Sequence, residues 1–191
     1  MAVMRQATLW LARHAPVLAE GGLCYGATDL RADDIETRAA AEALAARLPR
    51  GLTVLTSPLQ RCERLALALQ GLRPDLVLQT DARLREMDFG SWEGRRWADI
   101  PRAEFDRWLA GFADTPPAAG AETVRALMER VGAAWDDWRA SGADALWVTH
   151  AGVMRAALLL SRGVRVPGSA AGWPADALPF GELMVLRPAA E

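Results

Sequence analysis

Short apolar runs alternate along the chain with longer stretches whose apolar residues recur at helical spacing. The apolar runs cover residues 8–12, 52–56, 76–80, 145–149 and 183–186, and the helical stretches cover residues 35–48, 58–70, 123–140 and 153–162. Strands separated by helices lie parallel in a sheet that the helices cover on both faces. The alternation therefore predicts an α/β fold, a three-layer αβα sandwich with a mostly parallel central sheet.

The length of the chain suits one substantial hydrophobic core. No linker-like stretch or internal repeat divides its 191 residues, so we expect a single domain over residues 1–191. Residues 90–122 fit no strand–helix repeat, and we interpret this segment as a lid-like insertion over one edge of the sheet. Its large aromatic side chains are Trp92, Trp97, Phe105, Trp108 and Phe112.

The aromatic residues of the insertion have two interpretations. Phe105, Trp108 and Phe112 lie at helical spacing, which favours the buried face of a lid helix. The alternative is that Trp92, Trp97 or Trp108 stacks on a flat heterocyclic base of a ligand. Packing is the preferred interpretation.

Composition argues against several classes of partner. The formal net charge is -2 and the charged residues are mixed along the chain, so neither nucleic acid nor an acidic membrane surface is expected as a partner. The N-terminal apolar run is too short for a signal or membrane helix, which favours a cytoplasmic protein. Cys24 and Cys62 form no metal-binding pattern, so reduced, partly buried thiols and no metal are expected. The oligomeric state stays open, with a dimer as one alternative.

The two histidines of the chain each follow a strand-like run. His14 comes directly after Arg13 at the end of the first run, and His150 comes directly after the run at residues 145–149. Ligand-binding groups of open α/β sheets gather just beyond the carboxyl ends of the strands. Two imidazoles at that edge, one of them beside an arginine, indicate chemistry on an anion.

A third group should reach the same edge from a helix. Ser57 resembles a helix N-cap, because Pro58 follows at the first helical position and Gln60 is placed for a capping box. Arg61 then lies about one turn into the helix. Helical side chains lean toward the N-terminus, so we expect Arg61 to point back to the strand end where Arg13 and His14 emerge.

These residue types match the needs of phosphoryl transfer to a histidine. Such a reaction requires a neutral ring nitrogen, cationic donors on the phosphoryl oxygens and an acid for the leaving oxygen. Arg13, Arg61 and His150 are candidate donors, and the helix N-termini that follow Ser57 and Gly152 would add backbone donors. All 22 basic residues are arginine, whose planar fork matches phosphate oxygens.

The acid is expected to be a carboxyl group in a glycine-punctuated loop. Glu86 is the best candidate, since it follows a strand by a few residues. Asp88 and Glu93 lie in the same loop and are weaker alternatives.

Four motifs in this order resemble the histidine phosphatase, or phosphoglycerate mutase-like, superfamily. They are Arg13-His14, Ser57-Pro58-Leu59-x-Arg61, Glu86-x-x-Phe89-Gly90-x-Trp92-Glu93-Gly94 and Thr149-His150-x-Gly152-Val153. The resemblance implies a phosphohistidine mechanism with His14 as nucleophile and Glu86 as proton donor. It also implies a phosphate pocket of Arg13, Arg61 and His150, a small phosphomonoester as the bound partner, and neither metal nor cofactor.

A further segment points to one substrate class within that superfamily. Cys24-Tyr25-Gly26-x-x-Asp29 resembles alpha-ribazole phosphatases, which act on alpha-ribazole 5'-phosphate in cobalamin nucleotide-loop assembly. Tyr25, Gly26, Thr28 and Gly152 are accordingly candidate substrate-binding residues, although Tyr25 is as well suited to packing the loop. A broad-specificity phosphatase and a phosphoglycerate mutase-like enzyme are the enzyme alternatives, and a catalytically silent phosphate-ligand binding protein is the alternative of another class.

The chain departs from the superfamily pattern directly after His14. Where the family often has Gly-x-Thr-x-x-Asn, this chain has residues 15–20 ending in Glu20, so a common phosphate-contacting Asn is missing. A carboxylate inside the pocket would repel a phosphate dianion. We therefore expect Glu20 to face solvent, and backbone groups or Thr28 to take the place of the Asn.

Overall fold

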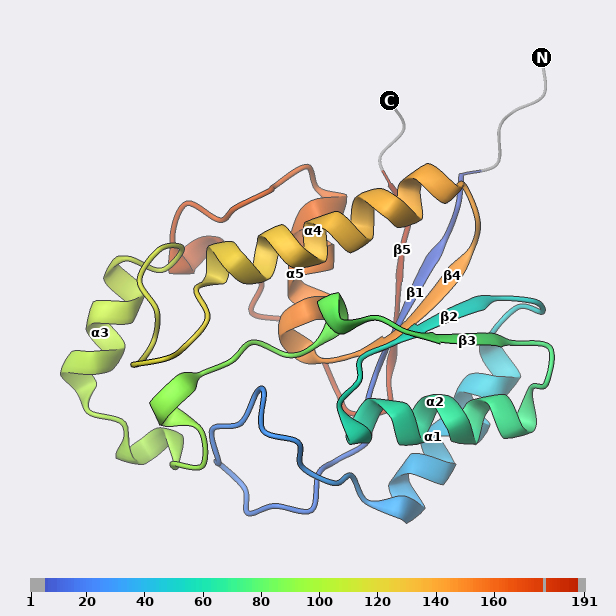
Figure 1. Cartoon of the computed structure of the whole chain (residues 1–191), viewed down its shortest axis with the longest axis horizontal. Coiled ribbons are helices and arrows are strands. Elements are labelled where there is room, and N and C mark those ends of the chain that lie inside the picture. Colours follow the sequence, from blue (N-terminus) through green and yellow to red (C-terminus); the bar gives the residue numbers. More distant parts are fainter. Residues whose placement is uncertain (1–5, 177, 189–191) are drawn as a thin grey trace.

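The computed structural model describes residues 6–176 and 178–188, and its centre is a five-stranded sheet (Figure 1). The strands are β1 (Leu9–Arg13), β2 (Thr53–Thr56), β3 (Val77–Thr80), β4 (Ala145–Thr149) and β5 (Leu183–Leu186). Their order across the sheet is β3-β2-β4-β1-β5. Of these described strands only β5, at one edge, pairs antiparallel to its neighbour. The predicted mostly parallel sheet is confirmed.

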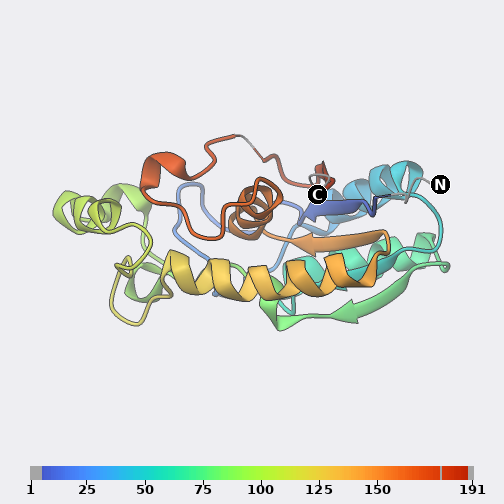
Figure 2. The ribbon, with the colours of Figure 1, turned by 90° about the horizontal axis from the view of Figure 1, so that it is seen from above.

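Helices cover both faces of the sheet, as the two views of the ribbon show (Figures 1 and 2). Helices α1 (Asp34–Arg47) and α2 (Gln60–Leu72) pack on one face, and α4 (Val124–Ser141) and α5 (Ala151–Ser161) pack on the other. Helix α3 (Arg102–Ala110) lies away from the sheet, beyond its carboxyl edge. The three-layer αβα architecture expected from the sequence is therefore present.

Two hydrophobic clusters separate the layers. Leu9 and Leu11 of β1 belong to the cluster under α4 and α5, whereas Ala12 belongs to the cluster under α1 and α2. In the same way, Trp147 and Leu146 of β4 face opposite clusters. Successive side chains of a strand point to opposite faces, so these buried strands must be apolar on both. That requirement explains why their sequences read as continuous apolar runs.

The register of the strands brings their carboxyl ends to one level. Arg13 of β1 pairs with Thr149 of β4, and Thr56 of β2 pairs with Val148. The residues that follow, His14, His150 and Ser57, consequently emerge side by side. None of the helices in the described part of the chain is long and apolar enough to cross a membrane.

One sequence-based expectation about the helices is wrong. Helix α2 begins at Gln60 with Leu59 as its N-cap, so Ser57 does not cap it. The Ser57 hydroxyl accepts a weak hydrogen bond from the Leu59 amide at 3.3 Å and lies 2.8 Å from Nε2 of His150. The hydroxyl is thus used at the strand edge, and the helix starts two residues later than Pro58.

Candidate active site

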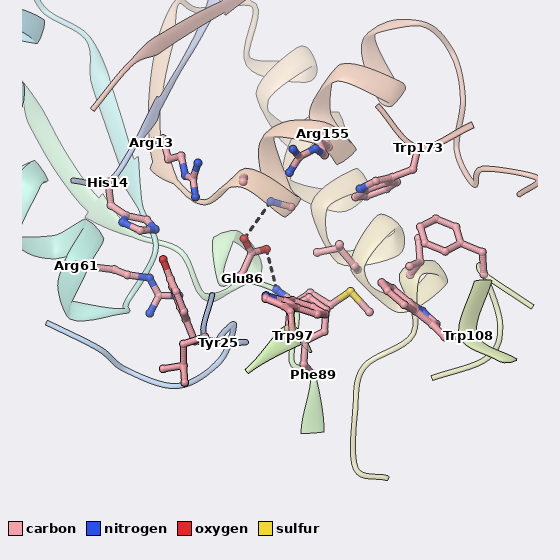
Figure 3. A pocket seen from close by; sticks show the side chains of 17 residues that line it. Arg13, His14, Tyr25, Arg61, Glu86, Phe89, Trp97, Trp108, Arg155 and Trp173 are labelled. Carbon is pink, nitrogen blue, oxygen red and sulfur yellow. Dashed lines mark hydrogen bonds between the residues drawn. The ribbon is translucent and has the colours of Figure 1, made fainter. Parts of the chain in front are cut away.

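The carboxyl edge of the sheet borders a cavity of about 340 Å³ (Figure 3). Its polar lining residues are Arg13, His14, Tyr25, Arg61, Glu86 and Arg155. In the close view, Arg13, His14 and Arg61 lie at one end, Trp108 and Trp173 lie at the other, and Glu86 and Trp97 lie between them. One end of the cavity is therefore cationic and the other aromatic.

His14 is held as a neutral ring with one free nitrogen. Nδ1 lies 2.7 Å from the carbonyl oxygen of Ala15, and since a carbonyl can only accept, Nδ1 carries the hydrogen. Burial, assisted by the charges of Arg61 and Arg13, lowers the pKa of His14 to about 3. Near neutral pH, Nε2 accordingly keeps an unprotonated lone pair, which is the form that a nucleophile requires.

Arg13 is fixed by the segment that precedes β5. Its Nη1 donates to the carbonyl oxygen of Leu178, and its guanidinium carbon lies 3.7 Å from the centroid of the Phe180 ring. The ring centroid of Phe180 also lies 5.5 Å from that of His14. Phe180 thus packs against both members of the Arg13-His14 motif and limits the positions that either can take.

Arg61 is fully buried and is held by backbone carbonyls. Nη2 donates to Gly26 at 2.6 Å, Nη1 donates to Thr28 at 2.7 Å, and Nε donates to Nδ1 of His150 at 3.2 Å. Three of the five guanidinium N–H donors are used in this way, which fixes the plane of the group and leaves two donors for an anion. The sequence-based expectation that Arg61 points back to the strand ends is met.

Gly26 and Thr28 hold Arg61 through their carbonyl oxygens. Neither is among the described residues that line the cavity. A Cβ at Gly26 would lie 1.8 Å from the carbonyl oxygen of Met87, so the close approach of two backbones requires glycine. Thr28 is exposed, and its hydroxyl donates to Glu93. Of the two expected replacements for the missing Asn, the Thr28 hydroxyl is therefore ruled out, because it already has an acceptor, and replacement by backbone groups stays a prediction.

His150 is fully buried behind the cavity. Nδ1 accepts from Arg61, so Nε2 carries the hydrogen and donates to the Ser57 hydroxyl at 2.8 Å. Burial, followed by the charge of Arg61, lowers the pKa of His150 well below 6.5. The ring centroid lies 5.1 Å from that of His14. Both ring nitrogens are occupied, so in this structure His150 orients Arg61 and does not present a free donor.

Glu86 faces the cavity with both carboxylate oxygens anchored (Figure 3). Oε1 accepts from the amide of Met87 at 2.9 Å, and Oε2 accepts from the amide of Gly152 at 3.0 Å. A Cβ at Gly152 would lie 2.2 Å from Oε1, so only glycine fits beside this carboxylate. The helix that follows His150 thus supplies a backbone donor at Gly152, and the carboxylate already occupies that donor.

The competing carboxylates of the loop have other tasks. Glu93 accepts from the amides of Ala27, Thr28 and Phe89, and Asp88 accepts from the amide of Gly90. Of these three acidic residues in the described chain, only Glu86 lines the cavity. Glu20 is exposed and pairs with Arg96, so the expectation that it faces solvent is confirmed.

The far end of the cavity is apolar. Its lining residues come from the 22–26 loop, the segment after Glu86, the 90–122 insertion, α4 and the segment before β5, and they are Leu23, Met87, Phe89, Trp97, Trp108, Phe112, Val124, Leu127 and Trp173. Trp108 packs edge-on against Phe89, Trp92 and Phe105, and is 9% exposed. The packing interpretation is therefore confirmed for Trp108. Because Trp108 also lines the cavity, its stacking on a ligand stays a prediction.

A comparison with family models decides which family the chain is in. The model of the histidine phosphatase superfamily (branch 1) matches residues 9–169, which is most of the chain. The chain belongs to the histidine phosphatase superfamily. The resemblance inferred from the four motifs is thereby confirmed.

Individual relatives agree with this family. The glucosyl-3-phosphoglycerate phosphatase of Mycolicibacterium vanbaalenii is 30% identical over 185 residues, covering 90% of this chain and 79% of the relative. A bifunctional protein of Mycobacterium tuberculosis is 38% identical over 82 residues, but these cover 41% of this chain and only 21% of that longer protein. Among solved structures, a mycobacterial hydrolase has a TM-score of 0.80 at 26% identity, covering 96% of this chain and 83% of that chain. A protein from Thermus thermophilus has a TM-score of 0.72 at 28% identity, covering 96% of this chain and 99% of that chain.

Two parts of this histidine phosphatase site have no signal in the sequence. Trp173 and Phe180 lie in the segment before β5, which fits no motif; Trp173 lines the cavity and Phe180 packs against His14. Arg155 in the first half of α5 lines the cavity and donates to the carbonyl oxygens of Pro174 and Asp176. Arg155 and Arg13 together hold the segment before β5 against the site.

The cysteines of this superfamily member lie outside the chemistry. Both are free and buried, and burial raises the pKa of Cys24 to about 12. Burial also raises the pKa of Cys62, whose sulfur touches the His150 ring at 3.4 Å. Thiols held protonated are poor nucleophiles, so neither cysteine is suited to covalent chemistry. Within the described residues, no group of three or more His, Cys, Asp or Glu side chains could hold a metal ion.

Proposed function

We propose that the chain is a phosphomonoesterase that works through a phosphohistidine on His14. The observation that carries this proposal is the hydrogen bond from Nδ1 of His14 to Ala15, which leaves Nε2 as a free nucleophile in a cavity with Arg13 and Arg61. Glu86 lies across the same cavity. Nucleophile, cations and acid thus border one space large enough for a small ester.

The first step transfers the phosphoryl group to the protein. Nε2 of His14 attacks phosphorus, the bond from phosphorus to the ester oxygen breaks, and Glu86 gives its proton to the departing alkoxide. Arg13 and Arg61 stabilise the charge on the phosphoryl oxygens, and their fixed geometry means that little reorganisation is needed. His150 contributes by holding Arg61 in plane.

The second step releases phosphate. Water attacks the phosphohistidine, Glu86 now accepts a proton from that water, and the electron pair of the broken P–N bond returns to Nε2 of His14. No metal ion or cofactor enters either step. We expect turnover to persist in excess EDTA.

For the substrate we propose alpha-ribazole 5'-phosphate, with a broad-specificity phosphatase as the alternative. The Cys24-Tyr25-Gly26 segment supports this, and so does the aromatic end of the cavity, which suits a flat apolar group better than a polyhydroxylated one. The named activity of the Mycolicibacterium relative instead uses a glucosylated phosphoglycerate. A phosphoglycerate mutase-like activity and a silent phosphate-binding protein are the remaining alternatives.

The cytoplasmic location and the lid-like role of residues 90–122 stay predictions, and the oligomeric state stays open.

The test compares three phosphate esters and one variant. Phosphate release is measured from alpha-ribazole 5'-phosphate, 3-phosphoglycerate and an aryl phosphate, and acid-labile phosphate on the protein is measured after rapid mixing. We expect preference for the ribazole ester, and loss of both turnover and labelling in His14→Ala. Comparable slow turnover of all three esters would agree with the mechanism but would contradict the assignment of alpha-ribazole 5'-phosphate as the substrate. Near-normal activity of His14→Ala, or unlabelled wild-type protein, would overturn the mechanism.

A further inference from the structure

The segment that carries Glu86 has an irregular backbone whose carbonyl oxygens are held by distant side chains. Residues 85–89 form neither helix nor strand. The carbonyl oxygens of Arg83, Arg85 and Glu86 accept from one side chain, Arg130 of α4, and that of Leu84 accepts from the Thr149 hydroxyl at 2.8 Å. Four successive carbonyls are thereby fixed by two side chains from distant parts of the chain.

Arg130 makes its bonds in two directions. Nη1 donates to Arg83 and to Arg85, both at 2.7 Å, and Nη2 donates to Glu86 at 3.2 Å. Toward the other side, Nε and Nη2 donate to the two carboxylate oxygens of Glu122 at 2.7 and 2.8 Å. The two side chains are 22% and 18% exposed. A planar guanidinium can span three carbonyls and a carboxylate at once, which a lysine cannot.

Glu122 connects the same arginine to the other end of the loop. Its amide donates to the carbonyl oxygen of Asp88 at 2.9 Å, two residues after Glu86. Its carboxylate also neutralises the charge of Arg130. The guanidinium therefore acts on the loop through its hydrogen bonds to the carbonyl oxygens more than through its positive charge. The loop around Glu86 is consequently tied on both sides to the Glu122–Arg130 pair.

We infer that Arg130, oriented by Glu122, is a positioning residue that holds the Glu86 carboxyl in place for proton transfer to the leaving group. This inference rests on the proposed function, in which Glu86 is the acid. Arg130 makes no contact with the catalytic cavity among the described residues, so it acts only through the loop. A displacement of about 1 Å in such a group costs roughly a hundredfold in rate.

The experiment exploits the leaving group. 4-Nitrophenolate departs without a proton, whereas a simple alkoxide needs one, so loss of the acid affects alkyl esters selectively. We would measure kcat/KM, which reports the first chemical step, for an alkyl phosphate and for 4-nitrophenyl phosphate. For Arg130→Met we expect a loss of about a hundredfold on the alkyl ester and of less than about threefold on the aryl ester.

Two matched variants complete the test. Arg125→Met removes another arginine of α4, one paired with exposed Asp114, and should leave both esters unchanged. Glu122→Gln keeps the shape but loses the ion pair, and should give a smaller selective loss. It also keeps the inference testable if Arg130→Met does not fold.

The outcomes separate the two proposals. Equal losses on both esters in Arg130→Met and Glu122→Gln would show a merely structural role and overturn the inference. Glu86→Gln serves as the reference, because it should lose at least about a hundredfold on the alkyl ester alone. If Glu86→Gln shows that selectivity and the Arg130 and Glu122 variants do not, only the inference fails. If Glu86→Gln itself lacks it, the assignment of Glu86 as the acid fails too.

Discussion

The cationic end of the cavity and its aromatic end are built from different kinds of backbone. His14 and His150 directly follow strands paired in register, and Arg61 lies in the first turn of α2, which follows β2. All three are at most 2% exposed. At the aromatic end, Trp97, which is 38% exposed, and Trp173 lie in segments without long elements, whereas Trp108 lies in α3.

This difference separates two tasks. Groups that must hold a phosphoryl transition state gain from a backbone that cannot shift, and hydrogen-bonded strand ends provide that. Groups that select the alcohol can sit on loops, which vary without disturbing the sheet. Glu86 is the exception, since it lies on an irregular segment and depends on Arg130, Gly152 and Met87 to be placed as firmly as a strand-end residue.

The largest effect is expected at the rigid end, in Arg61→Met. Loss of this guanidinium removes two donors for the anion and leaves the carbonyl oxygens of Gly26 and Thr28 without their partner. We expect kcat/KM to fall by about 10³-fold for alkyl and aryl esters alike. The control is Arg64→Met, which removes an exposed arginine of the same helix that pairs with Asp34. It should leave kcat/KM unchanged for both ester classes. A loss restricted to one ester class would contradict a shared phosphate role.

The next effect concerns the junction of the two ends. In Gly152→Ala the new methyl group would lie 2.2 Å from Oε1 of Glu86 and must push the carboxylate aside. We expect kcat/KM for alkyl esters to fall by about a hundredfold, with little change for 4-nitrophenyl phosphate. Gly71→Ala in α2, where the methyl group meets no atom within 4 Å, is the matched control. Unchanged alkyl ester turnover in Gly152→Ala would argue against Glu86 as the acid.

The buried histidines should make stability depend on pH. Burial and the charge of Arg61 lower the pKa of His14 to about 3, and the same causes hold the pKa of His150 well below 6.5. In the unfolded chain both rings take up protons near pH ~6.5, so below that pH the unfolded state binds more protons. The free energy of unfolding should therefore decrease as the pH is lowered, by up to about 2 kcal/mol per histidine between about pH 6.5 and pH 5.

Urea unfolding between about pH 7.5 and pH 5 measures this dependence above the range in which ordinary carboxylates titrate. His14→Gln should show a shallower decline than the wild-type chain, because one of the two rings no longer titrates. Parallel declines in both proteins would mean that His14 is not held neutral by the fold.

The smallest effect is expected at the aromatic end. Trp173→Ala opens the far end of the cavity without touching His14, Arg61 or Glu86. We expect about a tenfold loss of kcat/KM for an ester with a large aromatic alcohol, and about unchanged values for a small alkyl phosphate. The small ester serves as the internal control. Equal losses on both would show that Trp173 supports the whole site and does not select the alcohol.

The strands and most helix positions were predictable from the sequence because their signal is local. The runs at residues 145–149 and 183–186 coincide with β4 and β5. Strand β1 is shifted by one residue at both ends, and β2 and β3 each begin one residue later than expected. Buried parallel strands must be apolar on both faces, so nearly every residue of such a strand is apolar and the run is visible in the sequence. The convergence of His14 and His150 follows from the same local pattern, since each is covalently attached to the end of a strand.

The partners of those residues were decided only by the tertiary structure. Ser57 was expected to cap a helix but lies against His150, Thr28 supports Arg61 and not the phosphate pocket, and Phe180 packs on Arg13 from the far end of the chain. The spacing of apolar residues in the sequence does not predict such contacts, because they join irregular segments whose positions depend on packing. The sequence by itself determined which groups reach the carboxyl edge of the sheet. The fold determined how each is oriented, because hydrogen bonds between distant segments form only once the layers have closed.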